Sequence, residues 1–497
     1  MDKIFVNPKI KNILKYYKRI WSVKHAQSLL GWDTKVNIPV LGIKERSVAE
    51  GELSFLSREL LTSSRFVELI EKASKEYLND YEKGVVRVLK RDIKIAKSLP
   101  PRFIREKSRI ESRCVKIWEE AKRKDNFLKF KPWLKRIVEI ERKTAEYLGY
   151  DRYPYDALLD FYEEGLRMKD LDPLFRDLKK GLKRILLKLE KRALEIHPIE
   201  KEKYEIENMK KVNLLILKIF GFPLEKRGKI HISEHPFTES ISINDVRITT
   251  NYEGIDFKRS LLSTIHEFGH ALYELQVNKR FDFTPIGKGV SSGIHESQSR
   301  FWENIIGRSK EFIQLIHPIL KQNLKFLSNY SFGDIFDYFN MVKPSLIRTE
   351  ADEVTYNFHI ILRYELEKLI INEKIDVDEL PKIWNEEMEN LLGVKPNNYK
   401  EGILQDIHWS SGIIGYFPTY TLGTVLSAQL KKHILRDVRD FNQKIINRDF
   451  SSIKEWLREK IHKFGSMYSP KDLLKKSFGE TIRVEYFLDY LKQKYIK

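Results

Sequence analysis

The chain has 497 residues, of which 42% are hydrophobic and 32% charged, and its 90 Lys and Arg outnumber its 71 Asp and Glu to give a formal net charge of +19. Acidic residues are interleaved with the basic ones almost everywhere, so we do not expect nucleic acid to be a partner. The charged share exceeds the usual ~25%, which is typical of surface ion-pair networks and hints at a thermophilic source.

Three features of the chain bear on its location. The single cysteine, Cys114, excludes an internal disulfide framework. The first residues, Met1–Pro8, lack the apolar core of a secretion signal. Apolar runs such as Leu214–Leu217 are cut by lysines well short of the ~20 residues that a membrane span needs. The sequence therefore predicts a soluble cytoplasmic protein with no membrane partner.

From residue 8 to about residue 225 the sequence predicts long amphipathic helices, because apolar residues recur at intervals of three and four. Pro100-Pro101 and Gly149 mark breaks between them. Residues 229–233 and 241–250 alternate polar with β-branched side chains, which indicates a small sheet. Helical periodicity then resumes to the C-terminus. We predict a mainly α fold with one small β-sheet beside the candidate site, and no linker divides the chain.

The stretch LSTIHEFGHAL lies on a predicted helix, because apolar residues recur at helical spacing over residues 261–275 and Asp256 is placed to cap its start. His266 and His270 are four apart, so they share one helix face and can bind one ion together. Glu267 lies about 100° round the helix and can act as general base for a metal-bound water. The alternative is a helix with two incidental histidines. Eight of the 12 histidines lie between residues 231 and 408, which favours the metal site.

A catalytic zinc site usually has three protein ligands and an open position for water. The position that would carry a third histidine in a metzincin is Gln276, so that class is excluded. A second helix predicted near residues 293–302 offers Glu296 or His295 as the third ligand, and Glu303 less readily. We expect one divalent ion, zinc first and cobalt as the alternative. A His, His, Glu set accepts several divalent ions, so the sequence does not name the ion.

Six motifs in this order resemble those of the carboxypeptidase Taq family of metallocarboxypeptidases. They are present without a mismatch, and two upstream stretches, Gly31–Asp33 and Pro154–Asp160, are also similar to the family. The six motifs are HPF (His235–Phe237), D-x-R-x-T (Asp245–Thr249), HExxH (His266–His270), HES (His295–Ser297), I/V-R-x-x-A-D (Ile347–Asp352) and G-x-x-Q-D-x-H-W (Gly402–Trp409).

The resemblance implies a largely helical fold with a long, deep substrate groove that runs down to the metal. It implies release of single residues from the C-termini of peptides, and a homodimer. His266, His270 and Glu296 would then bind the ion and Glu267 would be the general base and acid. We expect residues 1–497 to form a single catalytic unit, in which residues 1–225 form part of the groove wall and residues 226–497 bind metal and substrate.

Peptide hydrolysis develops negative charge on the carbonyl oxygen, which needs hydrogen-bond donors besides the metal. His408, Tyr416 and Tyr420 are the candidates, because they stand close together around a glycine-containing turn. Core packing is the alternative for either tyrosine, and the sequence does not choose between the two.

A carboxypeptidase must also hold the terminal carboxylate of its substrate, and the planar fork of arginine suits this task. Arg348 and Arg247 lie in the family motifs and are the candidates, although an arginine is more often a solvated or helix-pairing charge. His235 could contact the substrate backbone, or it could be a structural imidazole bonded to a carbonyl. The strand that carries Arg247 could pair with an extended substrate.

Two other functions compete with a metal-dependent carboxypeptidase. An endo-acting metallo-oligopeptidase of the same broad fold would not need a free substrate C-terminus, so Arg348 would not matter. A basic binding protein with a vestigial site would bind its partner in a salt-sensitive way. The intact ligands and base argue against this second alternative.

Overall fold

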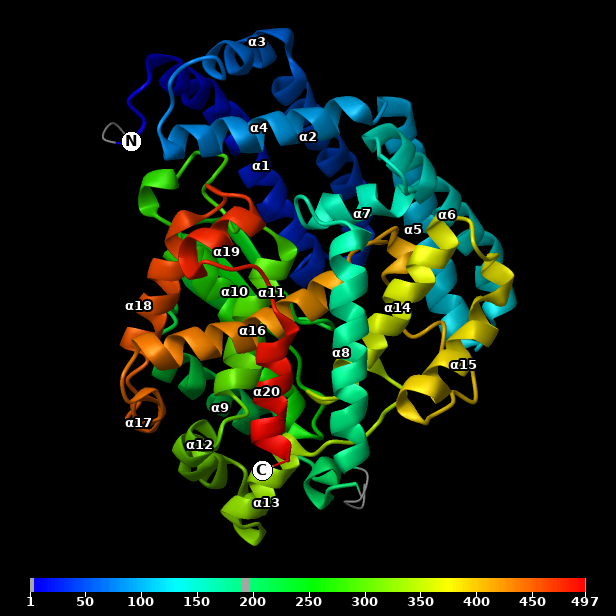
Figure 1. Ribbon diagram of the computed structural model, residues 1–497, viewed down its shortest axis with the longest axis vertical. Coiled ribbons are helices and arrows are strands. Elements are labelled where there is room, and N and C mark those ends of the chain that lie inside the picture. Colours follow the sequence, from blue (N-terminus) through cyan, green and yellow to red (C-terminus); the bar gives the residue numbers. More distant parts are fainter. Residues whose placement is uncertain (1–3, 190–195, 497) are drawn as a thin grey trace. The chain divides into compact units, whose positions relative to one another are not determined.

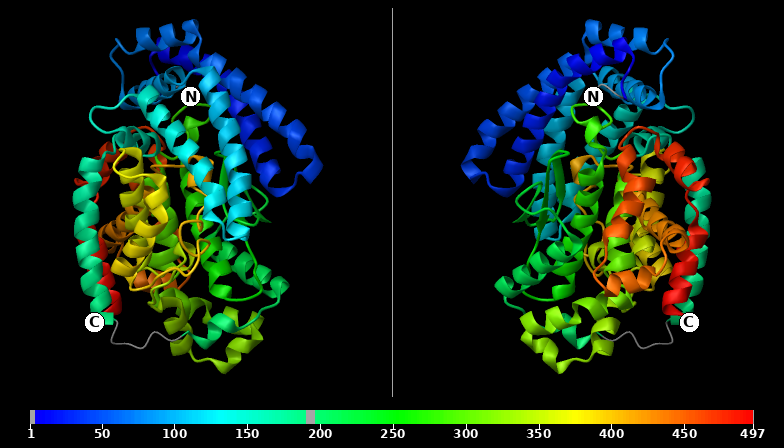
Figure 2. Two further views of the ribbon diagram at one scale, coloured as in Figure 1. Left: turned by 90° about the vertical axis from the view of Figure 1, so that its right-hand side faces the viewer. Right: turned by 90° about the vertical axis from the view of Figure 1, so that its left-hand side faces the viewer.

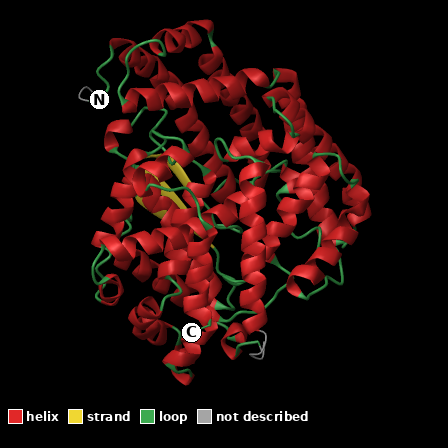
Figure 3. Ribbon diagram, viewed as in Figure 1, coloured by secondary structure: helices red, strands yellow, loops and turns green. Residues whose placement is uncertain are grey.

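The computed structural model describes residues 4–189 and 196–496, and most of these residues are helical (Figure 1). The predicted fold class is confirmed, since helices dominate and the strands form one small sheet (Figure 3). The chain divides into two compact units, each assembled from separate stretches of sequence. Unit 1 comprises Met1–Lys97, Ile196–Phe339 and Leu430–Thr481, and unit 2 comprises Ser98–Glu195, Asn340–Gln429 and Ile482–Lys497.

Unit 1 contains the sheet and, wholly or for the most part, the helices of three separate stretches of the chain. These helices are α1 (Pro8–Val36), α2 (Ile43–Thr62), α3 (Ser64–Ala73), α4 (Asp80–Ser98), α9 (Ile206–Phe220), α10 (Phe257–Gln276), α11 (Ser292–Arg300), the π-helical η4 (Phe301–Ile306), α12 (Lys310–Asn323), α13 (Phe332–Asn340), α17 (Phe441–Ile446), α18 (Ser451–Lys460) and α19 (Pro470–Phe478).

Unit 2 is helical throughout its described part. Its helices are α5 (Pro101–Arg123), α6 (Phe127–Leu148), α7 (Pro154–Tyr162), α8 (Met168–Leu189), η6 (Arg348–Glu350), α14 (Tyr356–Ile371), α15 (Leu380–Leu392), η8 (Trp409–Ser411) and α20 (Val484–Tyr495), and α16 (Phe417–Asp437) has residues in both units. Helices α8 and α20 run side by side in both views of Figure 2. Among the described residues, every helix is too short or too polar to span a bilayer.

The helix boundaries follow from local sequence chemistry. Asn7 caps α1, where its side chain accepts a hydrogen bond from the backbone N–H of Lys9 at 2.9 Å. Pro101 begins α5, and α6 ends at Gly149, which adopts φ +80°. The predicted breaks at Pro100-Pro101 and at Gly149 are therefore where helices end. The apolar faces of α1, α3 and α4 close a core that includes Ile10, Phe66 and Leu89.

One expectation about the helix α10 is wrong. Asp256 occupies its N-cap position, but its side chain makes no capping hydrogen bond and its backbone lies in the left-handed region at φ +51°. The carboxylate instead accepts a hydrogen bond from the hydroxyl of Tyr338 and forms an ion pair with Arg259 at 3.2 Å. These two partners take both carboxylate oxygens, so neither oxygen caps the helix.

The sheet has three strands, β1 (Gly228–Ile232), β2 (Thr238–Ser242) and β3 (Asp245–Thr250), in the order β1-β3-β2. Strand β1 pairs with β3 in parallel, and β2 pairs with β3 antiparallel. The single strand predicted over residues 241–250 is thus two strands, because the chain turns at Ile243-Asn244 and folds back as a hairpin.

Side-chain hydrogen bonds attach this sheet to α10. The hydroxyl of Thr264 donates to that of Thr250 at 2.8 Å, and the hydroxyl of Thr238 donates to the side chain of Glu267 at 2.6 Å. The sheet therefore holds the helix that carries the HExxH motif, and it reaches the glutamate of the motif itself.

An aromatic cluster supports the same helix from within unit 1. Phe268 lies 4.9 Å from Phe220 and 4.8 Å from Trp302, measured between ring centroids, and Phe450 packs edge-on against Phe220 at 4.9 Å. Offset and edge-to-face pairs of this kind add to the burial of apolar area. The cluster joins α9, α10, η4 and the residue before α18, so it fixes the position of η4 against α10.

Gly269 is the point of closest approach between α10 and α11. A Cβ atom at this position would lie 2.6 Å from the carbonyl oxygen of Gln298 and 2.6 Å from the Cα atom of Ser299. Both atoms belong to backbone, which cannot swing aside as a flexible side chain can. Because Gly269 has no side chain, α10 and α11 can approach closely. This approach brings Glu296 on α11 near His266 and His270 on α10.

We predict that Gly269→Ala destabilises unit 1 by about 1–3 kcal/mol through overpacking, and lowers divalent-metal affinity because α10 moves away from α11. The midpoint of thermal unfolding and the metal content are the measurements. Gly51→Ala on α2 is the control, because nothing lies within 4 Å of its added Cβ, and it should raise stability by up to about 1 kcal/mol. Equal effects of the two substitutions would contradict this account of Gly269.

Candidate active site

Three candidate metal ligands converge in unit 1. His266 and His270 come from α10 and Glu296 comes from α11, and one ligand atom of each lies within 4.8 Å of the others. Oε2 of Glu296 is 3.7 Å from Nε2 of His266 and 3.4 Å from Nε2 of His270. Two ligands bound about 2.1 Å from one tetrahedral ion lie about 3.4 Å apart. The donor set and its spacing therefore fit a divalent metal ion.

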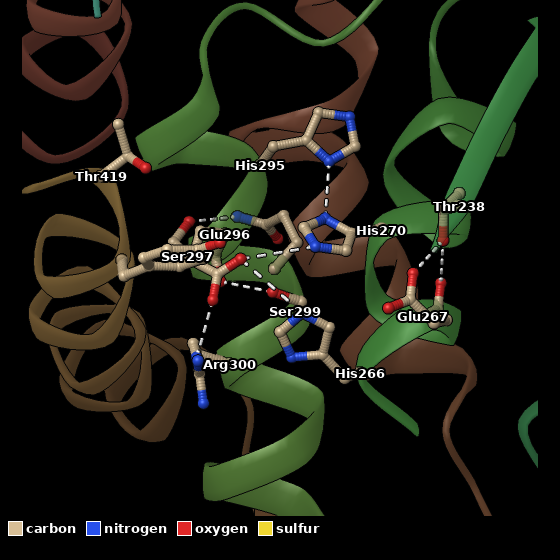
Figure 4. Close-up of polar contacts among 12 residues, drawn as sticks. Thr238, His266, Glu267, His270, His295, Glu296, Ser297, Ser299, Arg300 and Thr419 are labelled. Carbon is tan, nitrogen blue, oxygen red and sulfur yellow. Dashed lines mark hydrogen bonds and ion pairs between the residues drawn. The ribbon is translucent and has the colours of Figure 1, made fainter. Parts of the chain in front are cut away.

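The other ring nitrogen of each histidine is held from behind, as a metal ligand requires. Nδ1 of His266 lies 2.8 Å from Oε2 of Glu303. Nδ1 of His270 lies 2.8 Å from Nδ1 of His295 (Figure 4). Nε2 of His295 is in turn 2.7 Å from Oε1 of Glu274. A carboxylate only accepts, so His295 donates to Glu274 through Nε2 and accepts from His270 through Nδ1. When His266 and His270 are neutral, as metal binding requires, Nε2 of each is left unprotonated toward the metal position.

This arrangement separates the three residues that sequence reasoning considered for the third ligand. Glu296 brings an oxygen between the two Nε2 atoms, whereas His295 and Glu303 lie behind the histidines. Sequence reasoning gave no role to Glu274. Its position four residues after His270, one turn further along the same helix, is the signal that could have indicated it.

Arg300 orients the carboxylate of Glu296. Its Nε donates to Oε1 of Glu296 at 2.8 Å (Figure 4), and its Nη1 donates to Glu303 at 3.1 Å. Burial alone would raise the pKa of Glu296, but the charges of His266 and Arg300 hold that pKa well below its usual range. Glu296 is therefore an ionised carboxylate with Oε2 turned to the histidines.

Glu267 is buried next to these groups and is held by the sheet. The hydroxyl of Thr238 donates to Oε2 of Glu267 at 2.6 Å and to its backbone carbonyl oxygen at 3.1 Å. Burial raises the pKa of Glu267, against the effects of the His266 charge and the Thr238 hydrogen bond. A raised pKa suits a carboxylate that takes up and releases a proton near neutral pH. Sequence reasoning did not single out Thr238, because β2 was not predicted as a separate strand.

Unit 2 contains a second cluster of buried charge, built around Arg348. Nε and Nη2 of Arg348 each lie 2.9 Å from Oδ1 of Asp406, and Nη1 donates to the hydroxyl of Tyr356 at 3.1 Å. The other carboxylate oxygen of Asp406 accepts from Nε of Arg363 at 2.6 Å. The side chain of Gln405 accepts from the backbone N–H of Arg348 at 2.9 Å. Two of the sequence motifs are thus joined directly.

Asp406 and Arg363 had no role in the sequence-based prediction. Arg363 is fully buried, with its guanidinium 4.6 Å from the ring centroid of Trp384. Its signal in the sequence is a charged residue within the apolar run of α14, since arginine is almost never fully buried without a partner. The charges of Arg348 and Arg363 hold the pKa of Asp406 well below its usual range, although burial alone would raise it.

The three candidate oxyanion donors also lie together in unit 2. Nε2 of His408 is 3.1 Å from the hydroxyl of Tyr420, and the ring of Tyr416 lies 5.2 Å from that of Tyr420. The guanidinium of Arg348 stands over the Tyr420 ring at 5.2 Å. Burial, with the charge of Arg348, lowers the pKa of His408 to about 3, so its imidazole is neutral at neutral pH.

The remaining two candidates are in unit 1. His235 is exposed in the connection between β1 and β2, and its backbone carbonyl accepts from the hydroxyl of Ser233 at 2.7 Å. Arg247 lies on β3, where its Nε and Nη2 donate to the two carboxylate oxygens of Asp245, each at 2.8 Å. Nε and Nη2 of Arg247 are therefore already paired with Asp245, which belongs to the same D-x-R-x-T motif.

A helix with two histidines and a glutamate at HExxH spacing, completed by a carboxylate from a second helix, defines a metallopeptidase site. Comparison with known proteins gives the particular family. A family model described as "Carboxypeptidase Taq (M32) metallopeptidase" matches residues 12–495. The chain belongs to this family, as its sequence motifs predicted.

Relatives extend over the whole chain. It is 60% identical over 499 residues to "Thermostable carboxypeptidase 1" of Pyrococcus furiosus, with 100% of both chains covered. It is 37% identical to "Carboxypeptidase 1" of Bacillus subtilis, covering 98% of this chain and 97% of the relative. A solved structure of the Pyrococcus furiosus carboxypeptidase superposes with a TM-score of 0.97, covering 99% of this chain and 100% of the other. The protein is a metal-dependent carboxypeptidase that acts on peptides, and the endo-acting alternative is not favoured.

We predict that Glu303→Gln lowers divalent-metal affinity about 10- to 100-fold, because the amide no longer accepts a charge-assisted hydrogen bond from His266. Competition with a chelator measures the affinity. Glu68→Gln on α3, where the side chain is 64% exposed, is the control and should leave it unchanged. Wild-type affinity in Glu303→Gln would show that this carboxylate does not support the ligand.

Proposed function

We propose that this chain holds one divalent ion with His266, His270 and Glu296 and uses Glu267 as general base and acid to release single C-terminal residues from peptides. The observation that carries the proposal is the convergence of three ligand atoms within 4.8 Å beside a buried glutamate. Zinc is the first candidate ion and cobalt the alternative, since both suit nitrogen and carboxylate ligands. When bound, such an ion polarises a carbonyl and lowers the pKa of water.

The work of the chain's own residues begins with Glu267. Its carboxylate takes the proton of the attacking water and later delivers it to the nitrogen of the departing amino acid. The hydrogen bond from Thr238 leaves one carboxylate oxygen for this exchange, because it occupies Oε2. Burial raises the pKa of Glu267, which favours uptake of this proton.

We propose Arg348 as the residue that binds the terminal carboxylate of the substrate. Support comes from the charge balance of its cluster, because the two buried cations Arg348 and Arg363 share one carboxylate, Asp406. With His408 neutral, Arg348, Arg363 and Asp406 together carry a net positive charge in a buried place, which Glu367 offsets in part through its interaction with Arg363. An uncompensated buried charge is costly, so an anionic group is stabilised beside it. The hydrogen bonds that Arg348 donates to Asp406 fix the orientation of its guanidinium group.

His408 and Tyr420 are proposed as hydrogen-bond donors to the oxyanion, with Tyr416 as the alternative tyrosine. The hydrogen bond between His408 and Tyr420 favours Tyr420: when His408 donates through Nε2, the tyrosine hydroxyl is oriented and keeps its own proton for the oxyanion. The proposed substrate contacts of His235 and Arg247 stay predictions. For Arg247 the contact would have to use the part of the guanidinium that Asp245 does not hold.

Further predictions concern the whole chain. We propose that residues 1–497 act as one catalytic unit and assemble as a homodimer, which a mass measurement in solution tests. Exposed apolar side chains at Val40, Leu41 and Val48 offer a surface that a second copy would bury. Thermostability is proposed from the charged composition and from the names of two relatives, of Pyrococcus furiosus and Thermus thermophilus. Cytoplasmic location stays a prediction, which cell fractionation tests.

We predict that Glu267→Gln retains the metal and lowers kcat by at least about 10²-fold, because the amide cannot accept a proton. His270→Ala loses both metal and activity. Metal analysis and release of the C-terminal residue from an N-blocked peptide are the measurements, before and after chelation and after addition of Zn²⁺ or Co²⁺. Full activity in Glu267→Gln would refute the proposed base.

We predict that Arg348→Gln abolishes the preference for a free C-terminus. The kcat/KM ratio between a free-acid peptide and its C-terminal amide should fall about 10- to 100-fold, in line with the loss of charge-assisted hydrogen bonds. Arg176→Gln on α8, 71% exposed in its side chain, is the control and should keep the wild-type ratio. A ratio unchanged in Arg348→Gln would assign carboxylate binding to another residue.

A further inference from the structure

Helix α14 carries a fully buried carboxylate, Glu367, which lies outside the residues assigned so far. Three donors surround it. Oε1 accepts from Nε1 of Trp409 at 2.8 Å, and Oε2 accepts from the hydroxyl of Tyr155 at 2.7 Å and from the backbone N–H of Gly415 at 3.0 Å. A carboxylate can satisfy all three donors because it only accepts.

Two of these donors belong to one loop, residues 408–416, which we call the His408 loop. Trp409 directly follows His408, and Gly415 directly precedes Tyr416. Glu367 therefore binds the loop at both ends, in each case one residue from a candidate oxyanion donor.

The path of the His408 loop is narrowly constrained where Glu367 binds it. Gly415 adopts φ +93°, and a Cβ at this position would lie 2.9 Å from the backbone of Leu158. Only glycine adopts this conformation without strain. A small displacement of Gly415 would thus meet the backbone of α7 or break the hydrogen bond to Glu367.

The centre of the loop packs on α5 and α6 and Ile414 is buried, but one side of the loop borders empty space. A cavity of about 160 Å³ lies against residues 411–414, lined also by Glu111, Glu141 and Tyr162. Side chains around a cavity lose contacts on that side. The two hydrogen bonds that Glu367 accepts, from Trp409 and Gly415, therefore add to this packing in setting where the ends of the loop lie.

We propose that Glu367 is a positioning residue for catalysis, which holds His408 and the tyrosine at position 416 by binding Trp409 and Gly415. This inference rests on the proposed function of the His408 loop. Burial raises the pKa of Glu367 to about 7, while its three donors and Arg363 act in the opposite direction. Burying a carboxylate is unfavourable, and both oxygens of Glu367 bind the His408 loop or Tyr155. The position that Glu367 imposes on the loop accounts for this unfavourable burial.

Glu367→Gln tests the proposal, because glutamine has one oxygen and one NH₂ group for three donors. With its oxygen on Tyr155 and Gly415, its NH₂ group faces Nε1 of Trp409. We expect kcat to fall about 10- to 100-fold, KM to change less than about threefold, and metal content to stay at the wild-type level. Hydrogen exchange at the Gly415 amide should become faster. Glu365→Gln, on the same helix with a side chain 42% exposed, is the control and should change none of these quantities.

A rescue separates positioning from general structural damage. Trp409→Phe in the Glu367→Gln background removes the donor that faces the NH₂ group, so the double variant should have a higher kcat than Glu367→Gln alone. Should Glu367→Gln not fold, Gly415→Ala disturbs the same hydrogen bond by displacing the backbone N–H of residue 415. We expect the same drop in kcat at constant metal content.

Three results would overturn the proposal. They are wild-type kcat in Glu367→Gln, unchanged exchange at Gly415, and a double variant no better than the single one. If the wild-type protein released no C-terminal residues, the proposed function would fail, whereas exchange at Gly415 would still report whether Glu367 holds the loop.

Discussion

The close contact between α10 and α11 is the constraint on which the metal centre depends. Helical periodicity alone places His266 and His270 on one face, but the third ligand atom that we propose comes from Glu296 on another helix. It reaches the imidazoles because Gly269 presents no side chain to the backbone of α11. The sheet and the aromatic cluster fix α10 and η4 on their other sides. The ligand atoms are therefore placed by backbone packing, which is more rigid than side-chain contact.

Buried charge in this protein is held by more than one partner at a time. Arg300 binds the carboxylates of both Glu296 and Glu303, Asp406 accepts from two arginines, and Glu367 accepts from three donors. A lone buried charge would shift its pKa and become neutral, whereas multiple hydrogen bonds keep it ionised or fix its orientation. Each of these clusters contacts a residue to which we assign a role in catalysis or binding. The unfavourable free energy of burying charge is thus concentrated around residues whose position we propose to matter for catalysis or binding.

Much of the fold follows from local pattern, and its errors have identifiable causes. The breaks at Pro100-Pro101 and Gly149 and the helical periodicity on either side of the sheet agree with the structure, since proline, glycine and apolar spacing act locally. The hairpin within residues 241–250 was missed, because alternation continues through the turn at Ile243-Asn244 and does not mark it. The capping role of Asp256 was wrong because Tyr338, 82 residues away, competes for its carboxylate. No local rule includes such a partner.

The sequence by itself determined the family, the mainly α class with a small sheet, and the residue types of the candidate site, because six ordered motifs and helical spacing are properties of the chain alone. Tertiary structure decided which of Glu296, His295 and Glu303 faces the two histidines, since all three lie on one continuous helical stretch and differ only in direction. It also decided the partners of Glu267, Arg348 and the His408 loop, namely Thr238, Asp406 and Glu367. These contacts join residues 29 to 58 positions apart in the sequence. Residues this far apart meet only when the chain packs, so no local sequence pattern predicts the contact.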